Sequence, residues 1–303
     1  MLFRSVTAGK ETKFGIDPAS IPEVKEILET YHLTLAGINQ HIGSLFMTGD
    51  SFLASLNTLF DIARQFPGLE FIDMGGGFGI PYHKETDESP IDLKDLGEKL
   101  DKALYAFAKE CGRQVKFRIE PGRYISAECS VLLGQVHSIK ENYGRTYAGC
   151  DVGFNVLARP VMYDSYHGIE IYRADDAGTP AAAGQACSSA GLKDASLKDA
   201  GPKDAAQTEC TSKGNRSTDL EPVTVVGNIC ESGDILAKDR MLPPIREKDI
   251  LGILDAGAYG FTMSSNYNNR LRPAEILIRE NGEVVLVRER DTLEDLKRHL
   301  ISL

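Results

Sequence analysis

Residues 69–79 of the chain run Leu-Glu-Phe-Ile-Asp-Met-Gly-Gly-Gly-Phe-Gly, an apolar strand that ends directly in a group of glycines. Thr34–Asn39 and Val115–Ile119 are similar apolar runs, and each is followed by a polar segment, residues 41–44 and residues 120–123. Ligands of parallel α/β folds bind at the carboxyl ends of the strands. We therefore expect the three strand ends to face one pocket.

Amphipathic helices are expected between these strands, as a parallel sheet with crossover helices requires. The first covers residues 17–31 and opens on an aspartate and a proline, which suit an N-cap and a first turn. The second covers residues 50–64 and the third covers Leu93–Cys111. Lys13–Ile16 is expected to add a strand before the first helix. Four such units predict half of an eight-stranded barrel, and a doubly wound sheet fits the periodicity nearly as well.

After about residue 130 the pattern changes to short β-rich runs without long helices between them. These runs are Val131–Ile139, Thr146–Val152, Val223–Val226, Ile250–Leu254, Ala274–Ile278 and Val284–Val287. They predict a mostly antiparallel β domain, closed by a helix over Asp291–Leu300. We therefore expect an α/β domain over residues 1–130 and a β domain over residues 131–303.

Residues 174–220 interrupt the expected β domain. They are rich in Ala, Gly, Ser, Lys and Asp, and Lys-Asp-Ala occurs three times, starting at 193, 198 and 203. So little apolar surface does not offset the entropy lost on ordering, which predicts a disordered insertion. A marginal surface helix is the alternative.

Composition limits the partners of the chain. With 303 residues, 42% of them hydrophobic, it can form about two globular domains. The net charge of −10 argues against a nucleic-acid partner. None of the six cysteines forms a C-x-x-C pair, so no metal site is expected. No apolar run is long enough to span a membrane, and no signal peptide opens the chain, which favours the cytoplasm.

Two strand ends carry residue types suited to a phosphorylated ring. Gly75, Gly76 and Gly77 allow backbone N–H groups to approach a phosphate, although a tight turn explains them as well. Glu120 can hold a protonated pyridine nitrogen and Arg123 can bind a carboxylate, with a structural ion pair between them as the alternative.

Two segments of the β domain are polar enough to reach a ligand. Cys230–Asp234 places a thiol in a polar loop, where it can act as an acid, although a free cysteine more often packs as a small hydrophobe. Tyr259 stands among small residues that permit close approach of a ligand, and residues 264–268 continue this polar turn. Ordinary loop chemistry is the alternative for both segments.

Taken together and in this order, the motifs resemble the fold-type III pyridoxal-phosphate decarboxylases, and in detail the diaminopimelate decarboxylases. They are HIGS at 41–44, GGGFGIPY at 75–82, EPGRY at 120–124, CESGD at 230–234 and AYGFTMSSNYNNR at 258–270. Arg159-Pro160 and the following Met162–His167 are also similar to that family. The resemblance extends over residues 10–290 except the insertion. It implies the C-terminal half of a (β/α)8 barrel that binds pyridoxal 5′-phosphate, followed by a β domain.

The resemblance implies a cofactor site at the strand ends. His41 would stack on the cofactor ring and Glu120 would pair with its nitrogen. The remaining cofactor-binding residues would be Ser44, Gly75, Gly76, Gly77, Gly122, Arg123 and Tyr259.

It also implies a substrate and a reaction, the conversion of meso-2,6-diaminopimelate to L-lysine and carbon dioxide. Cys230 would return a proton to Cα and Glu231 would hold the distal ammonium. Arg123, Arg159, Tyr163 and Tyr259 would bind the substrate. Family members are homodimers, so Cys230 and Glu231 would complete the site of the second subunit. A decarboxylase of carboxynorspermidine or another basic amino acid is the alternative within this chemistry.

One family feature has no match in the sequence. The family's Schiff-base lysine lies in a Tyr-Ala-x-Lys-Ala motif on an early strand, and nothing before Lys13 resembles it. The similar Tyr105–Lys109 lies inside an expected helix. We therefore expect an N-terminally truncated decarboxylase whose activity alone is impaired. The alternative is a non-catalytic regulatory homologue that pairs with complete subunits, which the presence of Cys230, Glu231 and Glu120 disfavours.

Overall fold

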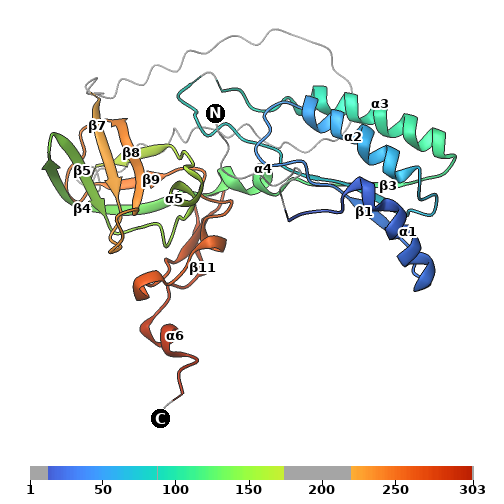
Figure 1. The fold of residues 1–303 in the computed structure, drawn as a ribbon. Coiled ribbons are helices and arrows are strands. Elements are labelled where there is room, and N and C mark those ends of the chain that lie inside the picture. The colour runs from blue at the N-terminus through green and yellow to red at the C-terminus, as the bar shows by residue number, and fades with distance from the viewer. Residues whose placement is uncertain (1–12, 87, 174–219, 302–303) are drawn as a thin grey trace, which may run out of the picture.

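The computed structural model of the chain describes residues 13–86, 88–173 and 220–301. Its first part alternates helices and strands. In chain order these are α1 (Ile21–Thr30), β1 (Gly37–Asn39), α2 (Asp50–Ala63), β2 (Phe71–Gly76), α3 (Leu93–Cys111), β3 (Lys116–Glu120) and α4 (Gly122–Ser126). The strands form a parallel sheet in the order β1-β2-β3, with α2 and α3 packed along it (Figure 1).

Local sequence explains why α3 forms where it does. Asp92 caps the helix by accepting hydrogen bonds from the backbone N–H groups of Lys94 and Asp95, and Gly112 ends it with a φ of 65°. The apolar side of α3 faces the sheet, and its Phe107 ring stacks on Phe60 of α2 with centroids 4.2 Å apart. This core fixes the sheet whose strand ends carry the expected site.

Two details of the first part differ from the prediction. Lys13–Ile16 is not a strand, and its Phe14 and Ile16 side chains are exposed. The prediction was wrong because it relied on the apolar run alone, without a partner strand. The short helix α4 was not predicted, since the Glu-Pro-Gly segment before it is typical of a turn.

The second part is a six-stranded sheet in the order β6-β9-β4-β5-β7-β8. The strands are β4 (Leu132–Asn142), β5 (Arg145–Cys150), β6 (Ile169–Tyr172), β7 (Glu221–Val226), β8 (Ile235–Leu242) and β9 (Ile250–Ile253). All neighbours are antiparallel except β5 and β7, so the mostly antiparallel prediction is confirmed. The predicted insertion at 174–220 lies outside the described residues except for Leu220.

Three elements of this part were not predicted from the sequence. Charged residues interrupt the apolar pattern of β8, β6 has only four residues, and α5 (Arg159–Tyr163) is a single short turn of helix. None of them has enough periodicity to be recognised before its neighbours are known.

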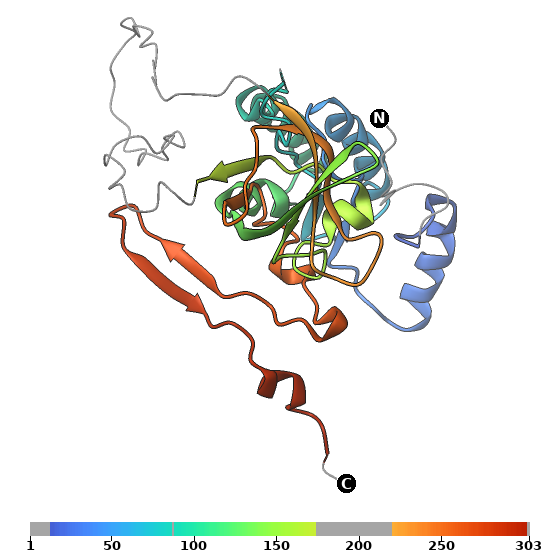
Figure 2. The same ribbon diagram turned by 90° about the vertical axis from the view of Figure 1, so that its left-hand side faces the viewer.

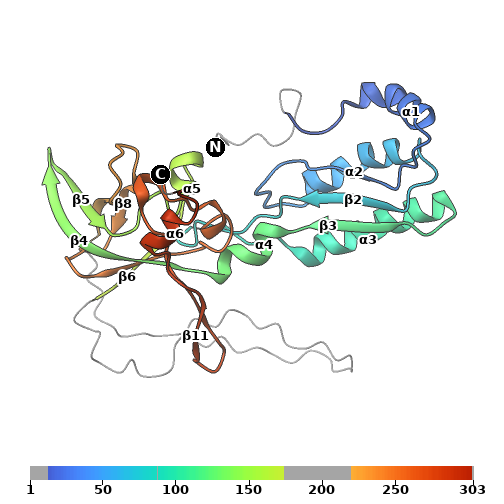
Figure 3. The ribbon, with the colours of Figure 1, turned by 90° about the horizontal axis from the view of Figure 1, so that it is seen from below.

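The C-terminal segment leaves the body of the molecule as a hairpin of β10 (Glu275–Ile278) and β11 (Val284–Arg288), followed by α6 (Leu293–Lys297) (Figures 2 and 3). Thr292 and Asp295 cap α6 reciprocally, and this helix is shorter than the predicted 291–300. The apolar side chains of the hairpin are exposed, among them Ile276, Ile278 and Leu286.

Candidate active site

Three strand ends meet at the carboxyl edge of the parallel sheet. Gly76 pairs with Glu120 across β2 and β3. A Cβ atom at Gly75 would lie 2.0 Å from the backbone oxygen of Gln40, and one at Gly76 would lie 2.2 Å from that of Glu120. Only glycine permits this approach, and Gly75 also has a φ of 76°. His41, the glycines and Glu120 are therefore brought together as the sequence predicted.

Arg123 extends from α4 toward the loops that follow β1 and β2. Its Nη1 donates to Tyr82 Oη at 2.7 Å and its Nη2 donates to Ser44 Oγ at 3.1 Å. The guanidinium also lies 4.9 Å from the centre of the Tyr259 ring. Its Nε is buried and has no hydrogen-bond partner among the described residues. Arg123 does not pair with Glu120, so the alternative of a structural ion pair is not what the geometry shows.

Arg159 approaches Tyr82 from the second, β-rich part of the molecule. It lies at the start of α5, is 4% exposed, and its guanidinium is 4.7 Å from the centre of the Tyr82 ring. Its Nη1 lies 2.8 Å from His167 Nε2. Burial lowers the pKa of Arg159, and the neighbouring charge of Arg123 lowers it further. Two guanidiniums thus flank the Tyr82 ring, and among the described residues neither of them forms an ion pair with a carboxylate.

We call Ser44, Tyr82, Arg123, Arg159, His167 and Tyr259 the arginine cluster. Both halves of the molecule build it, because Tyr82 and Arg123 come from the α/β part and Arg159 and His167 from the β part. Buried positive charge without a bonded carboxylate favours an anionic ligand. Tyr82 and His167 lay within motifs that we quoted from the sequence, but no pattern assigned them a role.

The residues after Tyr82 join the two parts of the molecule. Lys84 Nζ lies 2.7 Å from Asp255 Oδ1 and 3.0 Å from Glu128 Oε1. The hydroxyl of Tyr166 donates to Glu85, and the His83 and Tyr166 rings are 3.8 Å apart. We call residues 82–85 the clasp. It holds the two parts together beside the arginine cluster.

The loop Cys230–Asp234 is placed differently. Asp234 is buried and fixes the loop by accepting from the backbone N–H of Phe154 at 2.7 Å and of Ile229 at 2.8 Å. Cys230 and Glu231 are exposed. Within the described part of the chain, no hydrogen bond, ion pair or ring contact joins them to the arginine cluster. Tyr163 is likewise exposed on α5 and makes no such contact.

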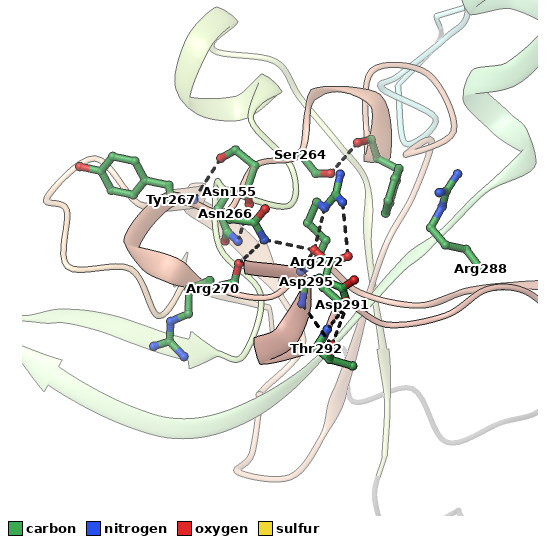
Figure 4. Close-up of polar contacts among 12 residues, drawn as sticks. Asn155, Ser264, Asn266, Tyr267, Arg270, Arg272, Arg288, Asp291, Thr292 and Asp295 are labelled. Atoms are coloured by element: carbon green, nitrogen blue, oxygen red, sulfur yellow. Dashed lines mark hydrogen bonds and ion pairs between the residues drawn. The ribbon is translucent and has the colours of Figure 1, made fainter. Parts of the chain in front are cut away.

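The polar turn at 264–268 serves the fold rather than the cluster (Figure 4). Asn266 Nδ2 donates to Arg270 O at 2.8 Å and to Asp291 Oδ2 at 3.1 Å. Arg272 Nε donates to the same Asp291 oxygen at 2.8 Å, and this bond lowers the pKa of Asp291 to about 2. For this turn the ordinary-loop alternative describes the structure.

Other ligand classes find no support in the part of the chain that the structure describes. No three His, Cys, Asp or Glu side chains there are grouped so that they could hold a metal ion. No helix among residues 13–86, 88–173 and 220–301 is long and apolar enough to cross a membrane. A hollow of about 600 Å³ lined by Gly68–Glu70 and Arg113–Lys116 lies at the opposite, amino ends of β2 and β3.

Comparisons with known proteins agree with the geometry. Residues 3–127 match the family model of the pyridoxal-binding domain of pyridoxal-dependent decarboxylases. The chain is 40% identical to the diaminopimelate decarboxylase of Methanothermobacter thermautotrophicus, covering 97% of this chain and 60% of that protein. It is 32% identical to the enzyme of Escherichia coli K12, covering 96% and 61%. The chain thus spans about three fifths of the curated relatives that it matches.

Solved structures give the same result. A crystal structure of diaminopimelate decarboxylase superimposes with a TM-score of 0.77 at 31% identity, covering 96% of this chain and 62% of that one. The Helicobacter pylori enzyme complexed with L-lysine superimposes with a TM-score of 0.71 at 27% identity, covering 95% and 60%. The parallel sheet of β1 to β3 therefore corresponds to part of a barrel, and the doubly wound alternative is not supported.

Proposed function

Because this chain belongs to the pyridoxal-dependent decarboxylase family, we propose that it forms part of an enzyme that converts meso-2,6-diaminopimelate to L-lysine and carbon dioxide. The observation that supports this most directly is the arginine cluster. It places the buried guanidinium of Arg159 and the half-buried guanidinium of Arg123, whose Nε is buried and unused, near the glycine-rich strand ends. A phosphorylated cofactor and a dicarboxylate substrate supply the anionic groups that such a site lacks.

The residues at the strand ends fit pyridoxal 5′-phosphate. Ser44, Gly75–Gly77 and Arg123 offer a hydroxyl, a backbone that no Cβ obstructs and a free N–H to the phosphate. Glu120 would hold the proton of the ring nitrogen, and His41, beside Gly75, would cover the ring. When bound, the cofactor supplies an electron-withdrawing ring that accepts the electron pair left as carbon dioxide departs.

The chain's other polar residues would hold the substrate. Arg159 is desolvated and suited to a carboxylate at the far end of the substrate, with Tyr163 beside it on α5. Tyr259 would contact both cofactor and substrate. Lysine and ornithine lack the distal carboxylate that Arg159 would bind, so they would bind more weakly than diaminopimelate.

Cys230 and Glu231 would act in a second copy of the chain. Both are exposed and out of contact with the arginine cluster of their own chain. A homodimer in which each loop enters the partner's site would let Cys230 protonate Cα and let Glu231 hold the distal ammonium. The proposal also includes two domains that divide near residue 130, an eight-stranded barrel to which the first domain belongs, and a cytoplasmic location.

Decarboxylation and cofactor labelling test the function. The full chain is given pyridoxal phosphate and diaminopimelate, and carbon dioxide and lysine are measured. We expect slow turnover by this chain alone, rising when a polypeptide that carries the family's lysine motif is added. Borohydride reduction with peptide mapping then places the cofactor on that polypeptide.

Binding of the cofactor supplies the matched control. We expect Arg123→Gln to weaken pyridoxal phosphate binding by roughly 10- to 100-fold. Arg145→Gln, which removes an exposed arginine of β5 paired with Asp239, should leave binding unchanged. Equal loss in both variants, or preferred release of carbon dioxide from carboxynorspermidine, would contradict the proposal.

A further inference from the structure

We infer, on the basis of the function proposed above, that His167 is a positioning residue: a neutral imidazole that aims the guanidinium of Arg159 at the distal carboxylate of the substrate. His167 follows α5 and precedes β6, so it lies eight residues after the arginine that it contacts. The inference assigns a role to a histidine that neither the cofactor nor the proton transfer requires.

Both nitrogens of His167 have a partner whose chemistry fixes the proton. Nδ1 lies 2.7 Å from the backbone oxygen of Leu254, and Nε2 lies 2.8 Å from Nη1 of Arg159. A carbonyl oxygen can only accept, so Nδ1 must carry the hydrogen. A guanidinium can only donate, so Nε2 must offer its lone pair. Only the neutral tautomer with hydrogen on Nδ1 satisfies both bonds.

The surroundings of His167 favour the neutral form. The residue is 1% exposed, and this burial lowers its pKa to about 4. The charges of Arg159, Arg123 and Arg240 act in the same direction. Near neutral pH the imidazole therefore cannot serve as a proton donor to substrate, and it remains a permanent acceptor for Arg159.

The imidazole itself is held from several sides. Its ring meets the edge of Tyr82 with centroids 5.5 Å apart and an interplanar angle of 73°. Arg240 Nη1 donates to the backbone oxygen of His167 at 2.9 Å, and the Arg240 guanidinium lies 3.6 Å from the Tyr166 ring centre. Tyr166 in turn bonds to Glu85 of the clasp. Rigid support of this kind lets one hydrogen bond set the plane of a flexible arginine side chain.

Nitrogen-15 NMR of the full chain tests the tautomer without any activity. We expect the His167 signals of a neutral Nδ1–H imidazole at every pH from about 5.5 to 8, because the pKa lies near 4. His167→Gln identifies these signals by their loss. His137→Gln is the matched control, since His137 also bonds to a backbone oxygen, that of Cys150, but has no hydrogen bond to an arginine of the described segments. An imidazolium or an Nε2–H tautomer at pH 7 would overturn the inference.

Kinetics test the positioning role in the holoenzyme assembled from this chain, pyridoxal phosphate and the polypeptide that carries the lysine motif. We expect His167→Leu to raise KM for diaminopimelate by roughly 10- to 100-fold, with kcat and cofactor affinity changed by less than about threefold. His167→Gln should recover most of the loss, because its amide oxygen can accept from Arg159. Unchanged KM in the leucine variant, or an equal fall in kcat and cofactor affinity, would show a merely structural role. If the wild-type protein releases no carbon dioxide from diaminopimelate, the proposed function fails, and the NMR result still decides the state of His167.

Discussion

The arginine cluster and the loop Cys230–Asp234 were both expected to serve one active site, yet the chain builds them in different ways. Tyr82, Arg159 and His167 of the cluster are buried, and the cluster joins two parts of the molecule beside the clasp. The loop has a fixed backbone, held by Asp234, and presents Cys230 and Glu231 to solvent.

The difference indicates which groups one chain can organise without help. The cluster contains the buried charge of Arg159, which forms no ion pair with a carboxylate among the described residues; this costs stability and prepares a site for anions. The reactive side chains of the loop contribute little to the free energy of unfolding, because they do not enter the core. Variants of the two regions should therefore separate effects on ligand binding from effects on the free energy of unfolding.

The largest effect is expected for Arg159→Met in the cluster. Diaminopimelate affinity should fall by about 2–4 kcal/mol, since a desolvated charge-assisted contact is lost. The free energy of unfolding should change by less than about 1 kcal/mol, because relief of charge burial offsets the bond lost by His167. Calorimetric titration and urea unfolding measure the two quantities. Arg159→Lys keeps the charge, and a similar loss of affinity in it would show that the planar guanidinium geometry is needed.

A somewhat smaller effect concerns acid stability. The pKa of His167 is lowered from 6.5 to about 4 in the folded chain, so only the unfolded chain takes up this proton between those values. The free energy of unfolding should therefore fall as pH drops from about 6.5 to 4, by up to about 3 kcal/mol. Urea midpoints of the wild type and of His167→Gln across this range measure the contribution. Parallel curves for the two proteins would refute it.

Removal of one hydroxyl from the cluster should have a modest effect. In Tyr82→Phe the ring still lies between the arginines, but Arg123 loses its bond to the phenolic oxygen. We expect about 1 kcal/mol of stability to be lost and cofactor affinity to fall about fivefold. Tyr172→Phe, whose hydroxyl bonds to Glu170 in a partly exposed position, is the control and should change neither.

The smallest effect on stability is expected in the loop. Cys230→Ser should change the free energy of unfolding by less than about 0.5 kcal/mol, because the thiol is exposed. When equal amounts of Cys230→Ser and Arg159→Met subunits are mixed, activity should recover to about a quarter of the wild-type value. Half of the dimers then contain one chain of each kind, and in each of these one of the two shared sites is intact. No recovery would mean that Cys230 serves its own chain, and the two regions would then form one site.

Strand ends could be predicted from the sequence because their signals are local. The glycines at 75–77 and Glu120 follow apolar runs directly, and the sheet brings them together as expected. The helix Leu93–Cys111 was predicted to the residue from its amphipathic pattern, and the structure adds Asp92 as its cap. Lys13–Ile16 was wrong for the opposite reason, because an apolar run forms a strand only where a neighbour pairs with it.

Long-range partners could not be predicted. Tyr82 and His167 lie 85 positions apart in sequence, and their contact depends on how two separate sheets dock. Lys84 and Glu85 of the clasp contact Asp255 and Tyr166 through side chains that look like ordinary surface residues in the sequence. The type of a residue indicates which chemistry its side chain can perform, whereas tertiary packing decides which other side chain it contacts.

The hairpin of β10 and β11 has a consequence for handling the protein. A two-stranded ribbon is only marginally stable by itself, and apolar side chains of this one, among them Ile278 and Val284, are exposed. The ion pair between Arg272 and Asp291 closes the base of the hairpin, and Asn266 of the preceding turn donates to the same carboxylate. Amide hydrogens of the ribbon should therefore exchange through local opening, long before those of β4 or β9. A protease that cuts at Asn281 or Gly282 would trim this arm and leave the docked sheets intact.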